Sequence, residues 1–260
     1  MWDRAILKEN AKMALSGGRY WTAYAVCVIS SLIVGCFSVI NGFFETKPDY
    51  VAMNTDPYES SLYAEQMVAR WKWIWFPYLL LVIFVALPLT VGISRFFVRN
   101  RFGETKLETM FSCFRDGYAS TTGAMFTTRL FTILWTFLLI IPGIVKSLEY
   151  SMVPFILSDN PSMPGGRARQ ISKIMTNGEK GAIFVLYLSV LGWYLLAGLA
   201  VGTLTGLFWP ISGLASVAVT PFVIAYQNAT LAELYIFLRD RAIRSGMVNP
   251  IELGLAPSAV

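Results

Sequence analysis

Two ionisable side chains, Lys146 and Glu149, lie three residues apart within an apolar stretch that runs from Leu130 to Leu157. Residues three apart share one face of a helix, so the ammonium and the carboxylate can pair there. Ionisable groups in such stretches are costly, and they usually face a protein interior or a water-filled cavity. We therefore single out Lys146, Glu149 and the adjacent Tyr150 as a candidate polar site within the membrane.

Three interpretations of this pair follow from the residues alone. In the first, the pair marks the tip of a hairpin, and the long lysine side chain extends to the outer membrane interface. In the second, the two groups form an ion pair that only holds the fold together. In the third, they bind or move an ion or a polar solute. The adjacent Pro142-Gly143 keeps the third interpretation open, because broken helices near charges are a feature of transport sites.

A second motif lies in a basic segment before this stretch. Arg115, Asp116 and Tyr118 form a candidate cytoplasmic interaction motif. Neighbouring residues do not face each other on a helix, so Arg115 and Asp116 are not a facing pair. The dipeptide Asp116-Gly117 is instead typical of a helix end.

Three glycines, Gly198, Gly202 and Gly206, recur every fourth residue and share one helical face. In lipid, such a face lets two helix backbones approach closely. The glycines therefore predict tight packing, either between the last two spans or between two copies of the chain. We favour the internal contact, because a multi-span bundle needs such contacts.

Residue types that support the common chemistries are missing. The chain has no histidine, which removes the commonest general base and metal ligand. No two of the cysteines Cys27, Cys36 and Cys113 have metal-site spacing, so we expect three small buried hydrophobic residues. Nucleophile, phosphate-loop and zinc-protease motifs are absent from the sequence. We therefore assign no catalytic, cofactor-binding or metal-binding residue, and we expect neither an enzyme nor a cofactor.

The composition indicates a membrane protein. Hydrophobic residues make up 55% of the 260 residues and charged residues 14%, against about 25% charged residues in soluble domains. Apolar runs of roughly 18 residues or more recur, and each is long enough to cross a bilayer as a helix. The net charge of +5 does not indicate nucleic-acid binding, because the basic residues fall in separate segments between the apolar runs.

The apolar runs predict an all-α fold, because a bilayer offers no water to unpaired backbone groups. We expect one polytopic transmembrane bundle in residues 1–245, followed by a disordered cytoplasmic tail at 246–260. The bundle has about six spans, of which the third and fourth form a short broken hairpin. The predicted spans are residues 20–43, 73–98, 130–145, 147–158, 181–204 and 207–230.

Other features concern prolines and amphipathic segments. Pro77 and Pro88 fall inside the second span, where neighbouring helices can satisfy the carbonyls that a proline leaves free. Amphipathic helices are expected at Ala5–Leu15, Leu107–Tyr118 and Gly166–Gly178. The first should lie at the membrane surface, and the second against the membrane or the bundle.

The basic residues predict the topology. Lys and Arg number four before residue 20, five in Arg99–Arg129, four in Arg167–Lys180 and three in Arg239–Arg244. The loop Glu45–Lys72 has three bases against five acids. Basic loops stay in the cytoplasm, and an even number of spans returns the chain to the side where it began. We therefore expect a multi-pass protein of the cytoplasmic membrane with both termini in the cytoplasm.

Short motifs also occur in a recognisable order and spacing. They are Phe114–Tyr118, Ile140–Lys146, Tyr150–Pro154, Asp159–Pro161 and Ser172–Met175. In these motifs the chain resembles a bacterial family of multi-span membrane proteins known as domain of unknown function 975. The resemblance covers about Arg4–Tyr235. It implies an integral inner-membrane protein and carries no activity with it.

These observations predict a non-catalytic membrane protein that binds, assembles or supports another membrane process. Its expected partners are the lipid bilayer and other membrane proteins or a second copy of the chain, and nucleic acid is not expected. The alternative is a small transporter or channel that uses Lys146, Glu149 and the broken hairpin. A distant alternative is an enzyme that acts at the membrane surface.

Overall fold

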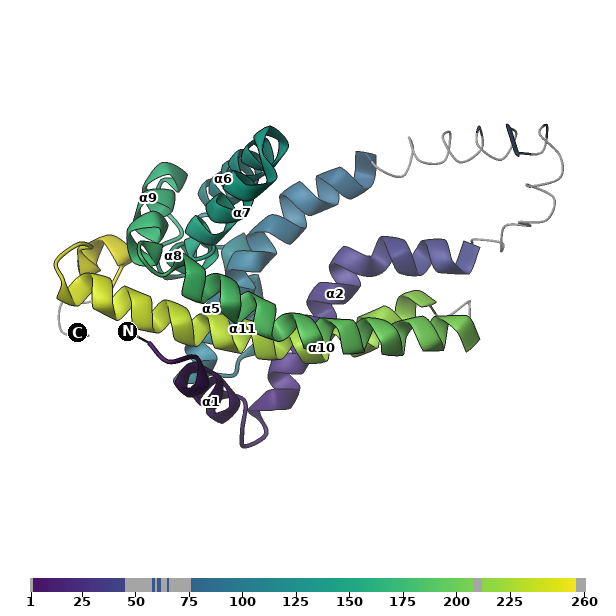
Figure 1. The fold of residues 1–260 in the computed structure, drawn as a ribbon, viewed down its shortest axis with the longest axis horizontal. Coiled ribbons are helices and arrows are strands. Elements are labelled where there is room, and N and C mark those ends of the chain that lie inside the picture. Colours follow the sequence, from purple (N-terminus) through teal and green to yellow (C-terminus); the bar gives the residue numbers. More distant parts are fainter. Residues whose placement is uncertain are drawn as a thin grey trace.

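The computed structural model describes residues 2–44, 58, 60–61, 65, 76–207 and 212–255. Within these residues every regular element is a helix (Figure 1), which confirms the all-α fold. Most of the predicted acidic loop, residues 45–72, lies outside the described residues. Four helices are long and apolar enough to cross a membrane, judged by length and composition: Phe76–Arg101, Ile140–Asp159, Lys180–Leu207 and Leu214–Arg244.

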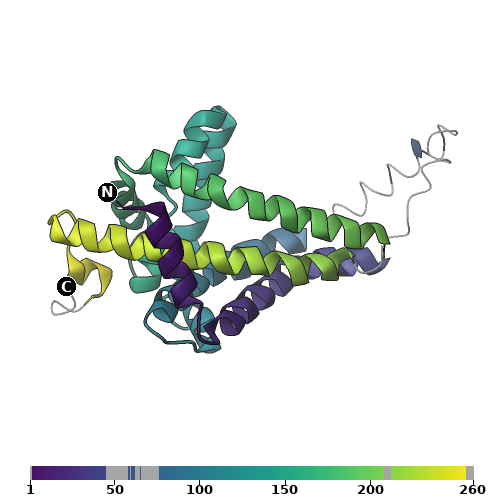
Figure 2. The same ribbon diagram turned by 60° about the horizontal axis from the view of Figure 1, so that its bottom comes forward.

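The 33-residue helix α11 (Ser212–Arg244) is the centre of the fold. Helices α2 (Arg19–Phe44) and α10 (Lys180–Leu207) pack along it. The short helix α1 (Arg4–Ala14) crosses it (Figure 2). Small residues on α11 let these neighbours approach closely; among them Ala225, Ala229 and Ala232 are buried.

A proline shapes the helix that leads into the core. Pro88 has no N–H, so the carbonyl of Phe84, four residues earlier, loses its helical donor. The helix widens there into the π-helix η1 (Val82–Ala86) and continues as α5 (Leu87–Arg101). The hydroxyl of Tyr118 donates to the Phe84 carbonyl at 2.7 Å. The expected rescue of a proline-freed carbonyl by a neighbouring segment is confirmed here.

Helices α6 (Tyr118–Leu138) and α7 (Ile140–Glu149) form an antiparallel hairpin that reverses at Leu139. The backbone of Leu139 is extended, with φ −156° and ψ 132°. The hairpin therefore has other limits than the predicted spans 130–145 and 147–158. Its first helix begins after the left-handed Gly117 turn and ends at Leu138, inside the predicted span 130–145.

The reversal does not occur at the proline. Pro142 lies in the first turn of α7, where a helix needs no N–H donor. Gly143 draws the two helices together, because a Cβ at this position would lie 2.5 Å from the Cα of Thr136. The tip consists of exposed apolar side chains from Phe137 to Ile141. Lys146 therefore does not mark the tip, and the first interpretation of this residue fails.

Both ends of the hairpin lie at one place. After a turn, helix α8 (Val153–Asp159) completes the return of the chain. Gly117, just before α6, has a φ of +66°, and a Cβ there would lie 3.0 Å from the carbonyl oxygen of Pro161. The Thr121 hydroxyl donates to the same carbonyl at 3.4 Å. The segment from α6 to α8 thus enters and leaves the bundle on the same side.

Two of the three predicted amphipathic segments form α-helices. The helices expected at Ala5–Leu15 and Gly166–Gly178 are confirmed as α1 and α9 (Gly165–Thr176). The segment expected at Leu107–Tyr118 instead forms a 3₁₀-helix, η2 (Leu107–Phe114). Its backbone lies directly on Gly92 of α5, so the segment packs on the bundle, which is one of the two expected placements, but as a 3₁₀-helix.

The glycine face of α10 also differs from the expectation. Gly198, Gly202 and Gly206 are exposed, and no described atom lies within 4 Å of a Cβ added at any of them. Helices α10 and α11 instead contact each other through a small apolar cluster that includes Val190 and Val223. The predicted internal packing through glycines is therefore not found in the described part of the chain. Contact between two copies stays a prediction.

The expected disordered tail is ordered over residues 246–255. The 3₁₀-helix η4 (Pro250–Leu253) packs on the core. Arg167 donates to both carboxylate oxygens of Glu252, at 2.5 and 3.0 Å. These hydrogen bonds lower the pKa of Glu252 below its usual value, so the carboxylate stays charged at neutral pH. Residues 256–260 lie outside the described residues.

Candidate functional site

Glu149 is the centre of a charged cluster at the end of α7. The Nζ atom of Lys146 lies 2.6 Å from its Oε2, and the Nζ of Lys180 lies 2.5 Å from its Oε1. The Glu149 side chain is only 4% exposed. Lys146 also lies 5.6 Å from the ring centroid of Trp135 on α6. The two residues singled out from the sequence do pair, but they share the pair with Lys180 from the start of α10.

This geometry is that of a structural ion pair. Both carboxylate oxygens of Glu149 are engaged, and its main-chain carbonyl accepts a hydrogen bond from the Ser172 hydroxyl of α9. The cluster therefore ties α7 to α9 and α10. Each carboxylate oxygen of Glu149 already has an ammonium partner.

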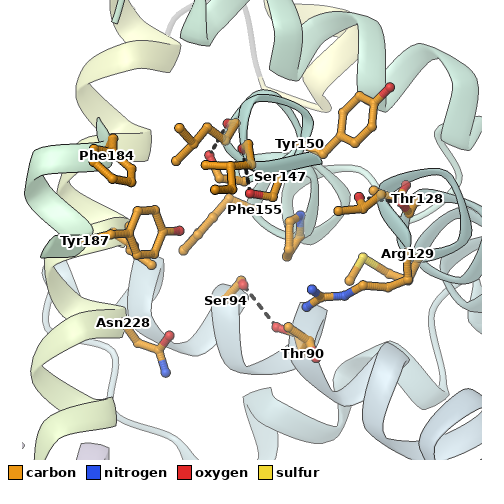
Figure 3. A pocket seen from close by; sticks show the side chains of 17 residues that line it. Thr90, Ser94, Thr128, Arg129, Ser147, Tyr150, Phe155, Phe184, Tyr187 and Asn228 are labelled. Carbon is orange, nitrogen blue, oxygen red and sulfur yellow. Dashed lines mark hydrogen bonds between the residues drawn. The ribbon is translucent and has the colours of Figure 1, made fainter. Parts of the chain in front are cut away.

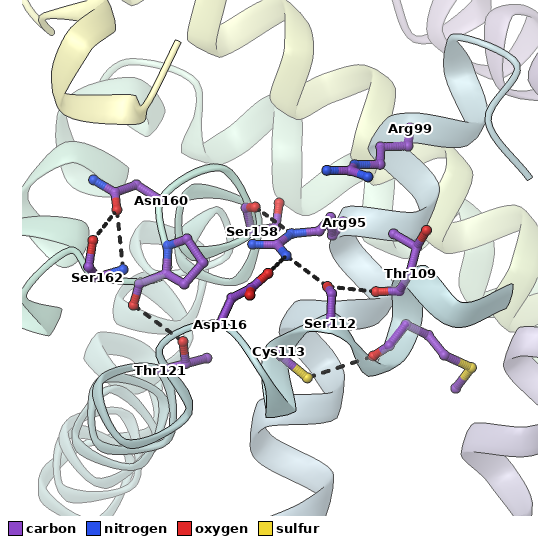
Figure 4. A network of polar contacts seen from close by, with 12 residues as sticks. Arg95, Arg99, Thr109, Ser112, Cys113, Asp116, Thr121, Ser158, Asn160 and Ser162 are labelled. Atoms are coloured by element: carbon purple, nitrogen blue, oxygen red, sulfur yellow. Dashed lines mark hydrogen bonds and ion pairs between the residues drawn. The ribbon is translucent and has the colours of Figure 1, made fainter. Parts of the chain in front are cut away.

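The motif of Arg115, Asp116 and Tyr118 is also structural in two of its three residues. Asp116 lies 3.2 Å from the buried guanidinium of Arg95 (Figure 4). The Tyr118 hydroxyl binds the Phe84 carbonyl, as described above. Arg115 is exposed and makes no hydrogen bond or ion pair with a described side chain. The structure thus separates Arg115 from the two residues that hold the fold.

Arg95 fastens three segments to one another. Its Nε donates to the carbonyl of Ser158 at 2.8 Å, and its Nη1 donates to the Ser112 hydroxyl of η2 at 2.8 Å (Figure 4). Arginine stays charged in proteins, so a side chain as buried as this one requires such partners. The network fixes η2 and the end of α8 against α5.

Buried carboxylates elsewhere in the described residues also have arginine partners. The pairs are Asp159 with Arg239 at 3.3 Å, Glu233 with Arg101 at 2.6 Å and Glu179 with Arg241 at 2.5 Å. The Tyr235 hydroxyl donates to Asp159 as well, at 2.7 Å. These contacts bind the C-terminal half of α11 to its neighbours.

A cavity of about 460 Å³ lies among α5, α6, α7, α8, α10 and α11. Ligand sites in proteins commonly have volumes of roughly 300–1,000 Å³. Its wall is rich in hydroxyl groups from several helices (Figure 3), which include Thr90, Ser94, Thr128, Ser147, Tyr150 and Tyr187. The third residue of the predicted site, Tyr150, therefore lines this cavity, whereas Lys146 and Glu149 do not.

Arg129 is the one charged residue in the cavity wall. Its guanidinium points toward Thr90 and Ser94 (Figure 3). It makes no hydrogen bond or ion pair with any described residue, and it lies near enough to Tyr187 to act on it electrostatically. Sequence reasoning counted Arg129 with the basic flank of a span that begins at residue 130. The absence of a helix breaker between Tyr118 and Leu138 was the available signal for a longer helix.

The described residues offer no metal centre or reactive thiol. They contain no group of three or more His, Cys, Asp and Glu side chains that could hold a metal ion. Cys27 and Cys113 are buried, as expected. Burial raises the pKa of the Cys113 thiol to about 11, so this thiol stays protonated at neutral pH. The side chain of Cys36 lies outside the described residues.

Comparison with known proteins adds one finding. A family model described as "Protein of unknown function (DUF975)" matches residues 74–242, which include α5 to α10 and most of α11. Searches of curated proteins and of solved structures found no match. The matched region contains every residue named above as lining the cavity.

Proposed function

The chain belongs to the DUF975 family of proteins of unknown function, and we propose that it is a non-catalytic binding protein of the bacterial cytoplasmic membrane. The ligand would occupy the cavity that Figure 3 shows. The observation that carries this proposal is the cavity itself, which six helices wall and which concentrates hydroxyl groups in an otherwise apolar bundle. Concave sites with a few convergent polar groups are where proteins bind small molecules.

The proposal includes a topology. Both ends of the α6–α8 segment meet at Gly117 and Pro161, while the tip is apolar and exposed. An apolar tip is stable in hydrocarbon when its backbone groups are bonded. The Leu139 N–H donates to the Trp135 carbonyl, and the Gly143 N–H donates to the Leu139 carbonyl. We therefore propose a re-entrant hairpin that enters from the cytoplasmic side, with both chain termini on that side.

Cysteine labelling tests this topology. In a background without Cys27, Cys36 and Cys113, we expect Ile140→Cys to resist a membrane-impermeant maleimide in intact and in permeabilised cells. The control Ser245→Cys should react only after permeabilisation, because it follows α11 on the cytoplasmic side. Labelling of Ile140→Cys from outside intact cells would show a full crossing and contradict the re-entrant hairpin.

A cavity-filling variant tests the binding role. Ser147 lines the cavity but is exposed, so Ser147→Phe can place a ring there without repacking the core. We expect wild-type protein, purified in mild detergent, to retain a small molecule or lipid that native mass spectrometry detects. Ser147→Phe should lose most of it. The control Ser120→Phe lies on an exposed position of α6 outside the cavity and should retain it.

Retention of the same adduct by Ser147→Phe would place the binding elsewhere. Wild-type protein that carries no adduct and binds none of the lipids or anions named below would remove the binding role altogether.

A further inference from the structure

Arg129 is an exposed residue in the cavity wall, and the described chain gives it no carboxylate partner. A guanidinium cannot be deprotonated inside a protein, and an unpaired charge within an apolar helix bundle is costly. Buried charges in the described residues have partners of opposite sign, as Arg95 has in Asp116. Arg129 has no such partner in the described chain, although it stands in the cavity wall. An anion in the cavity would therefore supply an opposite charge that the described chain does not.

The neighbouring charges add to the positive field. Arg169 of α9 donates to the hydroxyls of Thr127 and Thr128, at 2.9 and 3.4 Å, and it has no carboxylate partner among the described residues. Lys146 and Lys180 share the single carboxylate of Glu149. Among these side chains around the cavity, the positive charges thus outnumber the negative ones. A cation would be repelled there, and an anion would be attracted.

The serine and threonine hydroxyls of the cavity wall already donate their hydrogen atoms within the protein. Those of Thr90, Ser94, Thr128 and Ser147 each donate to a carbonyl of their own helix, at 2.6 to 3.0 Å. Apart from Thr128, which already accepts from Arg169, their oxygen lone pairs are then free to accept hydrogen bonds from a ligand. The Tyr187 hydroxyl has no partner among the described residues and points into the cavity (Figure 3). The wall thus offers Arg129 and Tyr187 as donors among several acceptors.

We propose that the cavity binds the phosphate of a hydroxylated phosphate ester, such as a glycerophosphate group. Arg129 and Tyr187 donate to the phosphate oxygens, and the serine and threonine oxygens accept from the ligand's own hydroxyls. An arginine fork suits this task because it matches the geometry of phosphate oxygens. The proposal rests on the binding role above and adds the chemical class of the ligand. The phosphate can belong to a lipid headgroup or to a soluble ester, which share this chemistry.

Binding measurements on the full chain in an uncharged detergent test the proposal. The probes are phosphatidylglycerol, phosphatidylcholine, dioleoylglycerol and sn-glycerol 3-phosphate, each titrated while native mass spectrometry records the bound fraction. We expect phosphatidylglycerol to bind at least about tenfold more tightly than dioleoylglycerol, which has no phosphate, as the loss of a charge-assisted hydrogen bond predicts. Phosphatidylcholine should also bind more weakly than phosphatidylglycerol, because its headgroup has no hydroxyl and carries a cation. Arg129→Gln should remove this preference, and Arg129→Lys should reduce it. The matched control Arg115→Gln removes a charge from an exposed position and should leave it unchanged.

Each remaining outcome decides one point. If sn-glycerol 3-phosphate displaces phosphatidylglycerol and depends equally on Arg129, the phosphate comes from a soluble ester. If Arg129→Gln fails to fold, Tyr187→Phe replaces it and should weaken binding several-fold. The inference is overturned if Arg129→Gln binds phosphatidylglycerol as tightly as the wild type. The same holds for Tyr187→Phe where that variant replaces Arg129→Gln. Dioleoylglycerol binding that Ser147→Phe blocks but Arg129→Gln does not would refute the phosphate assignment and leave the binding role intact.

Discussion

The Glu149→Gln variant is expected to lose about 3 kcal/mol of stability, because it leaves two ammonium groups without their shared carboxylate. The Glu149 side chain is almost fully buried, whereas Lys146 and Lys180 are 22% and 31% exposed. This partial exposure places the expected loss at the lower end of the range for buried ion pairs. Thermal unfolding of the purified protein in detergent measures the effect.

Two matched variants separate the ion pair from general charge removal. Glu104→Gln breaks the exposed pair with Arg99, whose atoms lie 3.5 Å apart, and it should cost less than about 1 kcal/mol. Replacing Lys146, Glu149 and Lys180 together by Met, Leu and Met removes all three charges. That triple variant should lie near the wild type in stability.

These variants also test the transport hypothesis. A structural pair predicts that the triple variant folds and keeps any activity the protein has. If Glu149→Gln were as stable as the wild type but abolished a flux measured in liposomes, the structural interpretation of the cluster would be wrong. Lys146 and Glu149 would then be assigned to transport, as the alternative hypothesis from the sequence proposes.

The Gly92→Ala variant is expected to destabilise the protein by about 3 kcal/mol or more, as overpacking against a rigid neighbour does. A Cβ on Gly92 would lie 1.8 Å from the carbonyl oxygen of Met110 and 2.7 Å from its carbonyl carbon. Backbone atoms of η2 cannot rotate away as a side chain can. Either η2 must leave α5 or α5 must bend, and both movements break the Arg95 contacts with Ser112 and Asp116.

The control for this variant is Gly123→Ala on α6. No described atom lies within 4 Å of a Cβ added at Gly123, and alanine favours a helix by about 0.5–1 kcal/mol over glycine. We therefore expect opposite shifts in melting temperature for two identical chemical changes. Equal shifts would mean that η2 does not rest on α5 in the way described.

Some features follow from local sequence alone. The apolar runs indicate helices because hydrocarbon leaves backbone groups no other partners, and the all-α fold is confirmed. Family membership was readable from short motifs and is confirmed over residues 74–242. The pairing of Lys146 with Glu149 followed from helical spacing. Proline chemistry predicts that Pro88 leaves a backbone carbonyl without its helical donor. The sequence did not show that Tyr118 would be the residue that donates to this carbonyl.

Other features depend on how distant segments meet. Hydropathy does not distinguish a helix that ends at Leu138 from one that continues, since the tip is as apolar as its flanks. The pattern of glycines does not reveal which ones touch a neighbour, and Gly92 has a close contact where Gly202 has none.

The sequence by itself determined the helical fold and the local ion pair, because each depends on residues within a few positions of one another. Only the tertiary structure decided that Lys180 shares Glu149 across 31 residues and that Arg129 stands in a cavity without a carboxylate. Both results depend on which helices come together in space. That choice arises from packing summed over the whole bundle, and no local pattern encodes it.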